Sequence, residues 1–188
     1  MDQPRAPERV MRFEQLVELV GEPLRRYARR RLDPAAADDA LAEAFMVLWR
    51  RLDDVPVGAE LPWSYGVLRH CVANEARSAR RRAGLLVRLT GRPEPAGASV
   101  DPADQVDRAD PELAAALTRL RPAEQELLRL WAWEDLTPAE IAVVLGTTTN
   151  AVNIRLHRTR RRLAGLIGEG RKSADGGGHH QVEGGRTP

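Results

Sequence analysis

Apolar residues in the first 30 positions recur with the period of an α-helix. Large apolar side chains follow one another every three or four positions between residues 13 and 27. This spacing places them on one face of an amphipathic helix. The members of the stripe are Phe13, Leu16, Val17, Val20, Leu24 and Tyr27.

Two more helices are predicted before residue 90. Asp33 followed by Pro34 is typical of an N-cap and a first helical position, and apolar residues then recur at helical spacing over residues 41–52. After a loop over residues 53–60, a third helix is predicted to begin near Leu61 and to run into the arginines at 80–82.

A change in composition separates this helical part from the rest of the chain. Residues 91–109 are rich in Pro, Gly, Ala, Ser and Asp, which indicates a flexible linker. Helix starts recur at residues 110, 121 and 137, and the polar, Gly-rich residues 168–188 are predicted to be a disordered tail. With no alternating strand pattern, we expect an all-α fold of two small helical domains, residues 10–90 and 110–167.

Residues 137–162 have the pattern of a helix-turn-helix. Residues 137–140 read Thr-Pro-Ala-Glu, a capping box, and Ala142, Gly146 and Val152 supply the small residue, the turn and the apolar anchor. Amides and guanidinium groups lie away from the apolar stripe of the second helix, where they could reach base edges and phosphates. These residues are Asn150, Asn153, His157, Arg158 and Arg161. DNA binding is favoured over an ordinary helical hairpin with a solvated basic face.

The charge pattern supports two separate anionic contact surfaces. Although 29 basic and 27 acidic side chains leave a net charge of only +2, residues 69–92 hold seven basic and one acidic side chain. Residues 141–188 hold eight basic and three acidic side chains, whereas residues 93–140 hold four basic and eleven acidic side chains. The first basic block follows Trp63 and Tyr65, whose rings could stack on unpaired bases or belong to the core. Helical spacing favours the core for Trp63 and favours neither for Tyr65.

Other classes of protein fit the sequence less well. Cys71 is the single cysteine, which excludes an internal disulfide and a four-cysteine zinc site. No run of about 18 apolar residues and no signal-peptide core is present, so we expect a cytoplasmic protein without membrane insertion.

Three carboxylates lie on one face of the second predicted helix. They are Asp38, Asp39 and Glu43. These carboxylates could stabilise the N-terminal turn of the helix through its dipole, contact a basic protein surface, or bind Mg²⁺ in a nuclease. A magnesium nuclease would also need convergent ligands and a Gly-rich phosphate loop, and the sequence shows neither. We therefore expect no enzyme activity, no cofactor, no metal site and no small-molecule substrate.

Three segments resemble parts of bacterial sigma factors. Residues 38–50 resemble the helix that binds core RNA polymerase, residues 63–77 resemble the promoter-melting helix, and residues 117–163 resemble the C-terminal promoter-recognition domain. The order and coverage of these segments are similar to the small extracytoplasmic-function group of the sigma-70 family. The resemblance implies three partners: core RNA polymerase, promoter DNA and an anti-sigma factor.

The resemblance also implies roles for individual residues. Residues in the loop 54–60 and the following helix would bind a flipped base and the strand of the minus-ten element. The polymerase contacts would be Asp38, Asp39, Glu43, Phe45 and Trp49. The minus-ten contacts would be Trp63, Tyr65, Arg69, His70, Arg77 and Arg80. The minus-thirty-five contacts would be Asn150, Asn153, Ile154, Arg155, His157, Arg158 and Arg160.

Several positions depart from the family pattern. Ala42 stands where Gln is common, His70 and Asn74 replace a frequent Asn and a frequent acidic residue, and Asn150 and Asn153 replace Gly and a cation. An Asn can read adenine in a bidentate way, so we expect this chain to have its own promoter preference. The alternative function is a helix-turn-helix transcription regulator with an N-terminal sensing or interaction domain.

Overall fold

The computed structural model describes residues 6–90 and 111–175, which form α-helices and one short 3-10 helix without any strand. This confirms the predicted all-α fold. The first part contains α1 (Ala6–Arg29), α2 (Pro34–Arg50), η1 (Leu52–Asp54) and α3 (Glu60–Thr90). The second part contains α5 (Pro111–Thr118), α6 (Pro122–Ala132), α7 (Pro138–Leu145) and α8 (Thr149–Asp175). The expected linker, residues 91–109, lies outside the described residues.

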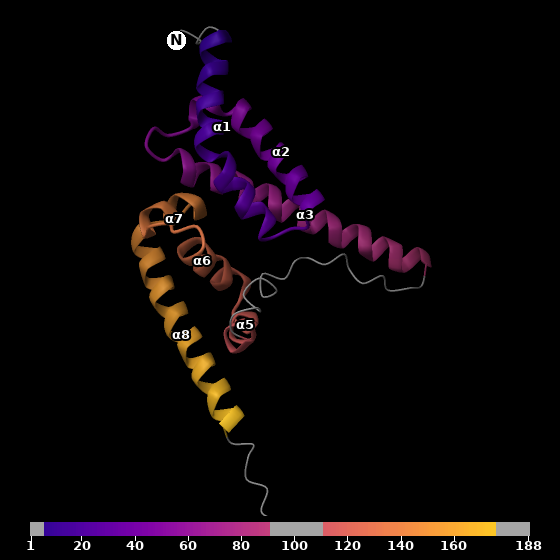
Figure 1. The fold of residues 1–188 in the computed structure, drawn as a ribbon, viewed down its shortest axis with the longest axis vertical. Coiled ribbons are helices and arrows are strands. Elements are labelled where there is room, and N and C mark those ends of the chain that lie inside the picture. The colour runs from indigo at the N-terminus through magenta and orange to yellow at the C-terminus, as the bar shows by residue number, and fades with distance from the viewer. Residues whose placement is uncertain (1–5, 91–110, 176–188) are drawn as a thin grey trace, which may run out of the picture.

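Helices α1, α2 and α3 pack against one another as an N-terminal bundle (Figure 1). Helix α2 begins where the sequence predicts, because the carboxylate of Asp33 accepts a hydrogen bond from the Ala36 amide at 3.0 Å and Pro34 takes the first helical position. The predicted stripes point inward: Leu24, Leu48 and Leu68 are completely buried. Apolar burial therefore holds the bundle together.

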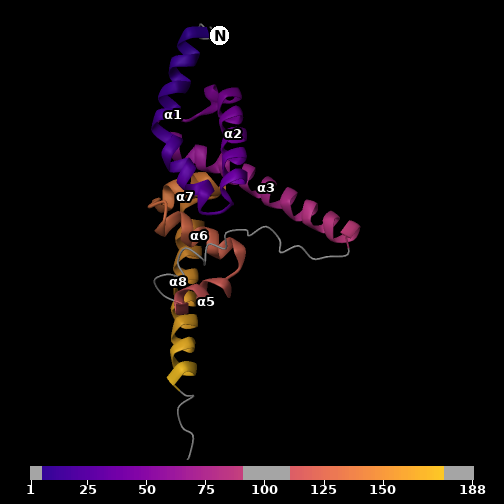
Figure 2. The same cartoon turned by 45° about the vertical axis from the view of Figure 1, so that its right-hand side comes forward.

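Helix α3 is the longest element of the described residues and only its first half is covered by other helices. Its second half extends away from the body of the molecule in both views (Figures 1 and 2). Arg81, Arg82 and Arg88 are exposed there. This extension carries much of the first basic block.

The C-terminal domain contains the predicted helix-turn-helix, formed by α7 and α8. The Thr137 hydroxyl accepts from the Glu140 amide at 3.3 Å, and the Glu140 carboxylate accepts from the Thr137 amide at 2.8 Å. Gly146 ends α7 with a left-handed φ of 60°, the conformation that glycine adopts without strain. Helix α8 continues to Asp175, eight residues into the expected tail, and residues 176–188 lie outside the described part.

The two domains lie against each other, mainly through α3 and α7 (Figure 2). A Cβ atom on Gly66 of α3 would lie 3.4 Å from the Val144 carbonyl oxygen of α7, so the two backbones approach closely here. Buried side chains of both domains form one continuous apolar cluster. The predicted domains are therefore joined by an interface as well as by the chain.

Candidate promoter and polymerase interface

The first turns of α8 present a polar face to solvent. Val152 and Leu156 are buried against the rest of the domain, which turns the opposite side of the helix outward. The predicted minus-thirty-five residues are all exposed, including Ile154, whose exposed fraction is 44%. They are Asn150, Asn153, Ile154, Arg155, His157, Arg158 and Arg160. The surface has the composition expected for a recognition helix in a major groove.

The turn before α8 fixes the direction of this helix. The amide of Ala151 donates to the Thr148 hydroxyl at 3.2 Å, so Thr148 caps the N-terminus of α8. The Thr147 amide bonds the Ala142 carbonyl at 2.9 Å and closes the end of α7 around Gly146. Because both ends of the turn are hydrogen-bonded, the exposed face of α8 is held in one orientation.

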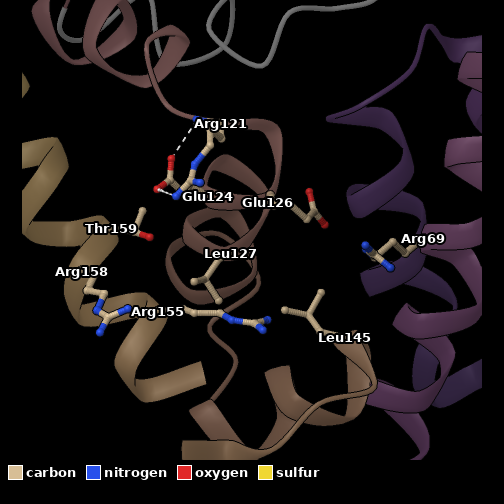
Figure 3. A pocket seen from close by; sticks show the side chains of 10 residues that line it. Arg69, Arg121, Glu124, Glu126, Leu127, Leu145, Arg155, Arg158 and Thr159 are labelled. Carbon is tan, nitrogen blue, oxygen red and sulfur yellow. Dashed lines mark hydrogen bonds and ion pairs between the residues drawn. The ribbon is translucent and has the colours of Figure 1, made fainter. Parts of the chain in front are cut away.

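Arginines of both domains meet at one cavity of about 420 Å³ (Figure 3). Arg155 and Arg158 reach it from α8, while Arg69 reaches it from α3 across the domain interface. Glu124 and Glu126 of α6 also line the cavity. The structure thus brings one predicted minus-ten residue and two predicted minus-thirty-five residues to the same place.

The predicted minus-ten residues divide into exposed and covered groups. His70, Arg77 and Arg80 are exposed on α3. Trp63 is half-buried, with the Arg51 guanidinium 5.1 Å from its ring centre. The part of the Trp63 ring left open is the kind of surface on which a base stacks.

Tyr65 is buried, with only 2% of its surface exposed. Its hydroxyl donates to Glu134 of the other domain at 3.4 Å, and its ring centre lies 5.3 Å from that of Tyr27. Burial, and then the charge of Glu134, raise the pKa of Tyr65 above its usual value. In this arrangement the Tyr65 ring cannot stack on a base, because the C-terminal domain covers it.

Helix α2 presents both acidic and apolar groups to solvent. Asp38, Asp39 and Glu43 are exposed, and Asp38 pairs with Arg29 at 3.5 Å. These are the carboxylates to which the family resemblance assigns polymerase binding.

Next to these carboxylates lies a shallow apolar hollow. It is lined by Phe13 of α1 and by Phe45, Met46, Trp49 and Arg50 of α2. Phe13 makes edge-to-face contacts with Phe45 and Trp49, at centroid distances of 6.5 and 5.2 Å. Phe13 and Met46 were not among the predicted contacts; the signal for Met46 was its place beside the buried stripe in an unbroken apolar run.

Residues 6–90 and 111–175 give little support for a metal site, a cysteine nucleophile or a membrane-spanning helix. Across residues 6–90 and 111–175, no three His, Cys, Asp or Glu side chains converge as metal ligands, so a magnesium nuclease has no ligand set there. Burial, followed by the charge of Glu43, raises the pKa of the buried Cys71 thiol to about 11, which makes it a poor nucleophile. None of the helices in these ranges is long and apolar enough to cross a membrane.

Comparisons with protein families match both domains. The family model for Sigma-70 region 2 matches residues 16–82, and the model for Sigma-70 region 4 matches residues 111–163. The first match assigns the N-terminal half to a sigma region and not to the sensing domain of the alternative interpretation. The two regions occur in the order expected for the extracytoplasmic-function group.

Two solved structures share the fold. CnrH, solved in complex with the cytosolic domain of CnrY, has a TM-score of 0.55 and 25% identity, over 84% of this chain and 88% of that one. The sigma factor RpoE from Bartonella quintana, solved with the anti-sigma factor NepR, has a TM-score of 0.53 and 23% identity, over 82% and 96%. The second likeness concerns the fold alone.

Two relatives are named as sigma factors. A probable RNA polymerase sigma factor RfaY from Xanthomonas campestris pv. campestris is 31% identical over an alignment of 137 residues. The match covers 68% of this chain and 33% of that protein. The RNA polymerase sigma-E factor of Streptomyces avermitilis is 30% identical over 155 residues, covering 82% of this chain and 84% of the relative. With sigma regions 2 and 4 matched in order, the chain belongs to the sigma-70 family of RNA polymerase sigma factors.

Proposed function

We propose that this chain is a promoter-specificity subunit that binds core RNA polymerase and directs initiation at minus-ten and minus-thirty-five elements. One observation carries the proposal: a single chain of this family presents an acidic and apolar face on α2 and an exposed recognition face on α8. It acts in the cytoplasm, on the nucleoid, as part of the polymerase holoenzyme. Its role is to bind and position, and the chemistry of RNA synthesis belongs to the polymerase.

The minus-thirty-five element is read by α8. Asn153, Ile154, His157 and Arg158 face the base edges of the major groove, while Arg155 and Arg160 contact phosphates. Their exposure on one helix, opposite the buried Val152 and Leu156, supports this side of α8 as the one that faces DNA. Phosphate contacts position the helix and base contacts select the sequence.

The minus-ten element is bound by α3 and the loop before it. Val57 in this loop is 94% exposed, and the loop ends beside the half-buried Trp63, which suits the capture of a flipped base. His70, Arg77 and Arg80 follow on exposed positions of α3, where they can hold the strand backbone. Tyr65 joins this surface once the C-terminal domain moves away from it.

Core polymerase is bound through α2. Asp39 and Glu43 supply exposed carboxylates for a basic surface, and Trp49, 37% exposed, supplies an apolar contact beside them. A mixed apolar and charged patch of this kind is typical of protein interfaces. The same patch is the surface that an anti-sigma factor would mask, and two proteins of similar fold were solved with a protein partner.

Run-off transcription with purified core polymerase and a library of genomic fragments tests the function. We expect initiation from a small set of fragments that depends on the added chain. Asp39→Ala with Glu43→Ala should remove it, and Glu18→Ala, which deletes an exposed carboxylate of α1, is the matched control. No initiation from any fragment, combined with tight duplex binding by the chain alone, would favour the helix-turn-helix regulator instead.

A further inference from the structure

Two arginines of α1 bind one carboxylate at the start of the loop over residues 54–60, which we call the minus-ten loop. This carboxylate is that of Asp53, in η1. Its Oδ2 atom lies 2.7 Å from Nη1 of Arg9, and its Oδ1 atom lies 3.2 Å from Nη1 of Arg12. Both carboxylate oxygens are therefore used, and they tie η1 to side chains 44 and 41 residues earlier in the chain.

Arg9 also contacts the helix to which polymerase binding is assigned. Its Nη2 atom donates to the Trp49 carbonyl at 2.7 Å, and its guanidinium lies 5.2 Å from the centre of the Trp49 ring. This carbonyl is in the last turn of α2, where backbone acceptors lack partners within the helix. A single side chain, 25% exposed, thus joins the end of α2 to η1.

A third arginine connects the next residue of η1 to α3. The Nε atom of Arg51 lies 2.9 Å from Oδ2 of Asp54, and its guanidinium lies 5.1 Å from the centre of the Trp63 ring. Because Asp53 and Asp54 are adjacent, η1 has one chain of contacts towards a tryptophan of α2 and one towards a tryptophan of α3. We call the charged members the η1 network: Arg9, Arg12, Arg51, Asp53 and Asp54.

The minus-ten loop is held at both of its ends. Leu52 and Val55, which are 1% and 6% exposed, anchor its start in the core, whereas Val57 points into solvent. Near its end, Gly58 adopts a left-handed φ of 80°. Backbone hydrogen bonds, first from Gly58 and then from its own amide, lower the pKa of the Glu60 carboxyl. The loop therefore has a defined shape, and the place of η1 decides where that shape is presented.

A hollow of about 230 Å³ lies between α1 and this loop. Its lining includes Leu19 of α1 and Val57 of the loop, together with the polar side chains of Arg12, Gln15 and Glu60. A nucleobase has apolar faces and a polar edge, and this combination of side chains suits both. Because Arg12 also binds the η1 carboxylate, the η1 network sets the distance between the α1 wall and the loop wall.

We propose that the η1 network positions the minus-ten loop and Trp63, and in this way sets the base preference at the minus-ten element. The inference rests on the proposed function, which assigns the capture of a flipped base to this loop. The five members are positioning residues, since they hold the surfaces that would meet the base. Because Arg9 contacts both Trp49 and Asp53, the polymerase face and the loop depend on one guanidinium. Exposed ion pairs add little to folding stability, so a broken pair should free the loop and leave the fold intact.

Asp53→Asn tests the proposal, because it removes the charge and keeps the size of the side chain. Holoenzymes assembled with each variant are compared on promoters found by run-off transcription, changed at single positions of either element. A wrong base costs roughly tenfold in affinity, and Asp53→Asn should remove most of this preference at the captured minus-ten base. The minus-thirty-five preference should stay as in the native chain. Asp53→Glu, which keeps the charge, should retain both preferences, as should Glu18→Gln, the matched control on an exposed carboxylate of α1.

Arg9→Ala provides an independent variant of the same contact. It should also lower the minus-ten preference, and adding Asp53→Asn to it should change little more than Asp53→Asn alone, because the two residues act through one ion pair. Arg25→Ala, an exposed arginine of the same helix, is its matched control and should keep the native preference.

The comparison between the two elements separates positioning from a general loss of structure. A misfolded variant would bind all promoters less well and lose preference at both elements alike. Such an equal loss in Asp53→Asn and Arg9→Ala, or a native minus-ten preference in both, would overturn the positioning role. If the native chain initiated from no fragment, the proposed function itself would fail.

Discussion

The guanidinium of Arg160 on α8 lies over the ring of Trp131 on α6, 4.7 Å from the ring centre. Arg158, two residues earlier, instead lines the cavity between the domains. The two arginines are therefore held in different surroundings although both are exposed on the same helix. A cation stacked on an aromatic ring keeps its charge on a fixed part of the surface, which suits a phosphate contact more than base readout.

Arg160→Ala and Arg158→Ala should have different effects on promoter binding by the holoenzyme. Arg160→Ala should lose one phosphate contact. The slope of log affinity against log salt concentration should then fall in magnitude by about one, equally for all promoter sequences. Loss of a base contact in Arg158→Ala should cost about 1–3 kcal/mol and relax the preference at one base pair. Titrations at several salt concentrations measure both. Arg25→Ala, which deletes an exposed arginine of α1, is the control.

Asn153→Ala tests whether an amide reads the minus-thirty-five element. Asn153 is exposed near the start of α8, and an Asn side chain can bond adenine through two hydrogen bonds. We expect the variant to lose discrimination of about 1–3 kcal/mol at a single base pair, measured by competition among promoters that differ there. An equal loss on every promoter would assign Asn153 to positioning instead.

Glu43→Lys should weaken the binding of core polymerase without unfolding the chain. The residue is exposed on α2, beside the apolar hollow of Phe45 and Trp49, and reversing its charge would repel a basic partner. We expect faster dissociation from immobilised polymerase and a weaker affinity, with an unchanged melting temperature. Glu18→Lys on α1 is the charge-matched control, and an equal effect of both variants would indicate a general loss of acidity.

The start of α6 should show a characteristic pH dependence. Hydrogen bonds from the Arg121 side chain, and then from its amide, lower the pKa of Glu124 from 4.5 to about 2. Because the folded pKa is the lower one, the stabilisation is complete above about pH 4.5 and is lost as the pH falls towards about 2. Urea unfolding of the native chain and of Glu124→Gln should give free energies that converge over this acidic range. If the difference between the two free energies of unfolding grew as the pH fell, the lowered pKa of Glu124 would be contradicted.

Thr137→Ala should destabilise the C-terminal domain by about 1 kcal/mol, because the Glu140 amide at the start of α7 loses its side-chain acceptor. Thr137→Ser keeps a hydroxyl in the same place and should retain most of the stability. Urea unfolding of both variants measures the difference. Equal free energies of unfolding for the two would show that the capping box adds nothing to the domain.

Local signals were enough to predict most helices and the turn. Asp33 with Pro34, and Thr137 with Glu140, act within a few residues of themselves, so the sequence pattern contains the whole interaction. The covering of Tyr65 could not be predicted in this way. Its partner Glu134 lies 69 residues away and carries no pattern of its own, because an isolated Glu at a helix end is common.

The same reasoning explains what was predicted for the candidate site and what was not. The polar face of α8 follows from helical spacing alone, and it is exposed as expected. At the domain interface, Arg31 of α1 pairs with Glu126 and Glu134 of the C-terminal domain, which are 95 and 103 residues away. Only the packing of one domain on the other brings these charges together, and no local periodicity encodes that packing.

The projecting end of α3 has a consequence for how this helix behaves in solution. A helical segment of fewer than about 15 residues without tertiary contacts is marginally stable in water. Arg77 lies three and four positions before Arg80 and Arg81, so these like charges are neighbours on the helix and repel one another. Its backbone amides should therefore exchange with deuterium much faster than those around the buried Leu68. An anionic strand lying along the arginines would relieve the repulsion and slow that exchange. Under the proposed function, the helical structure of this end of α3 should therefore depend on whether a nucleic acid is bound to it.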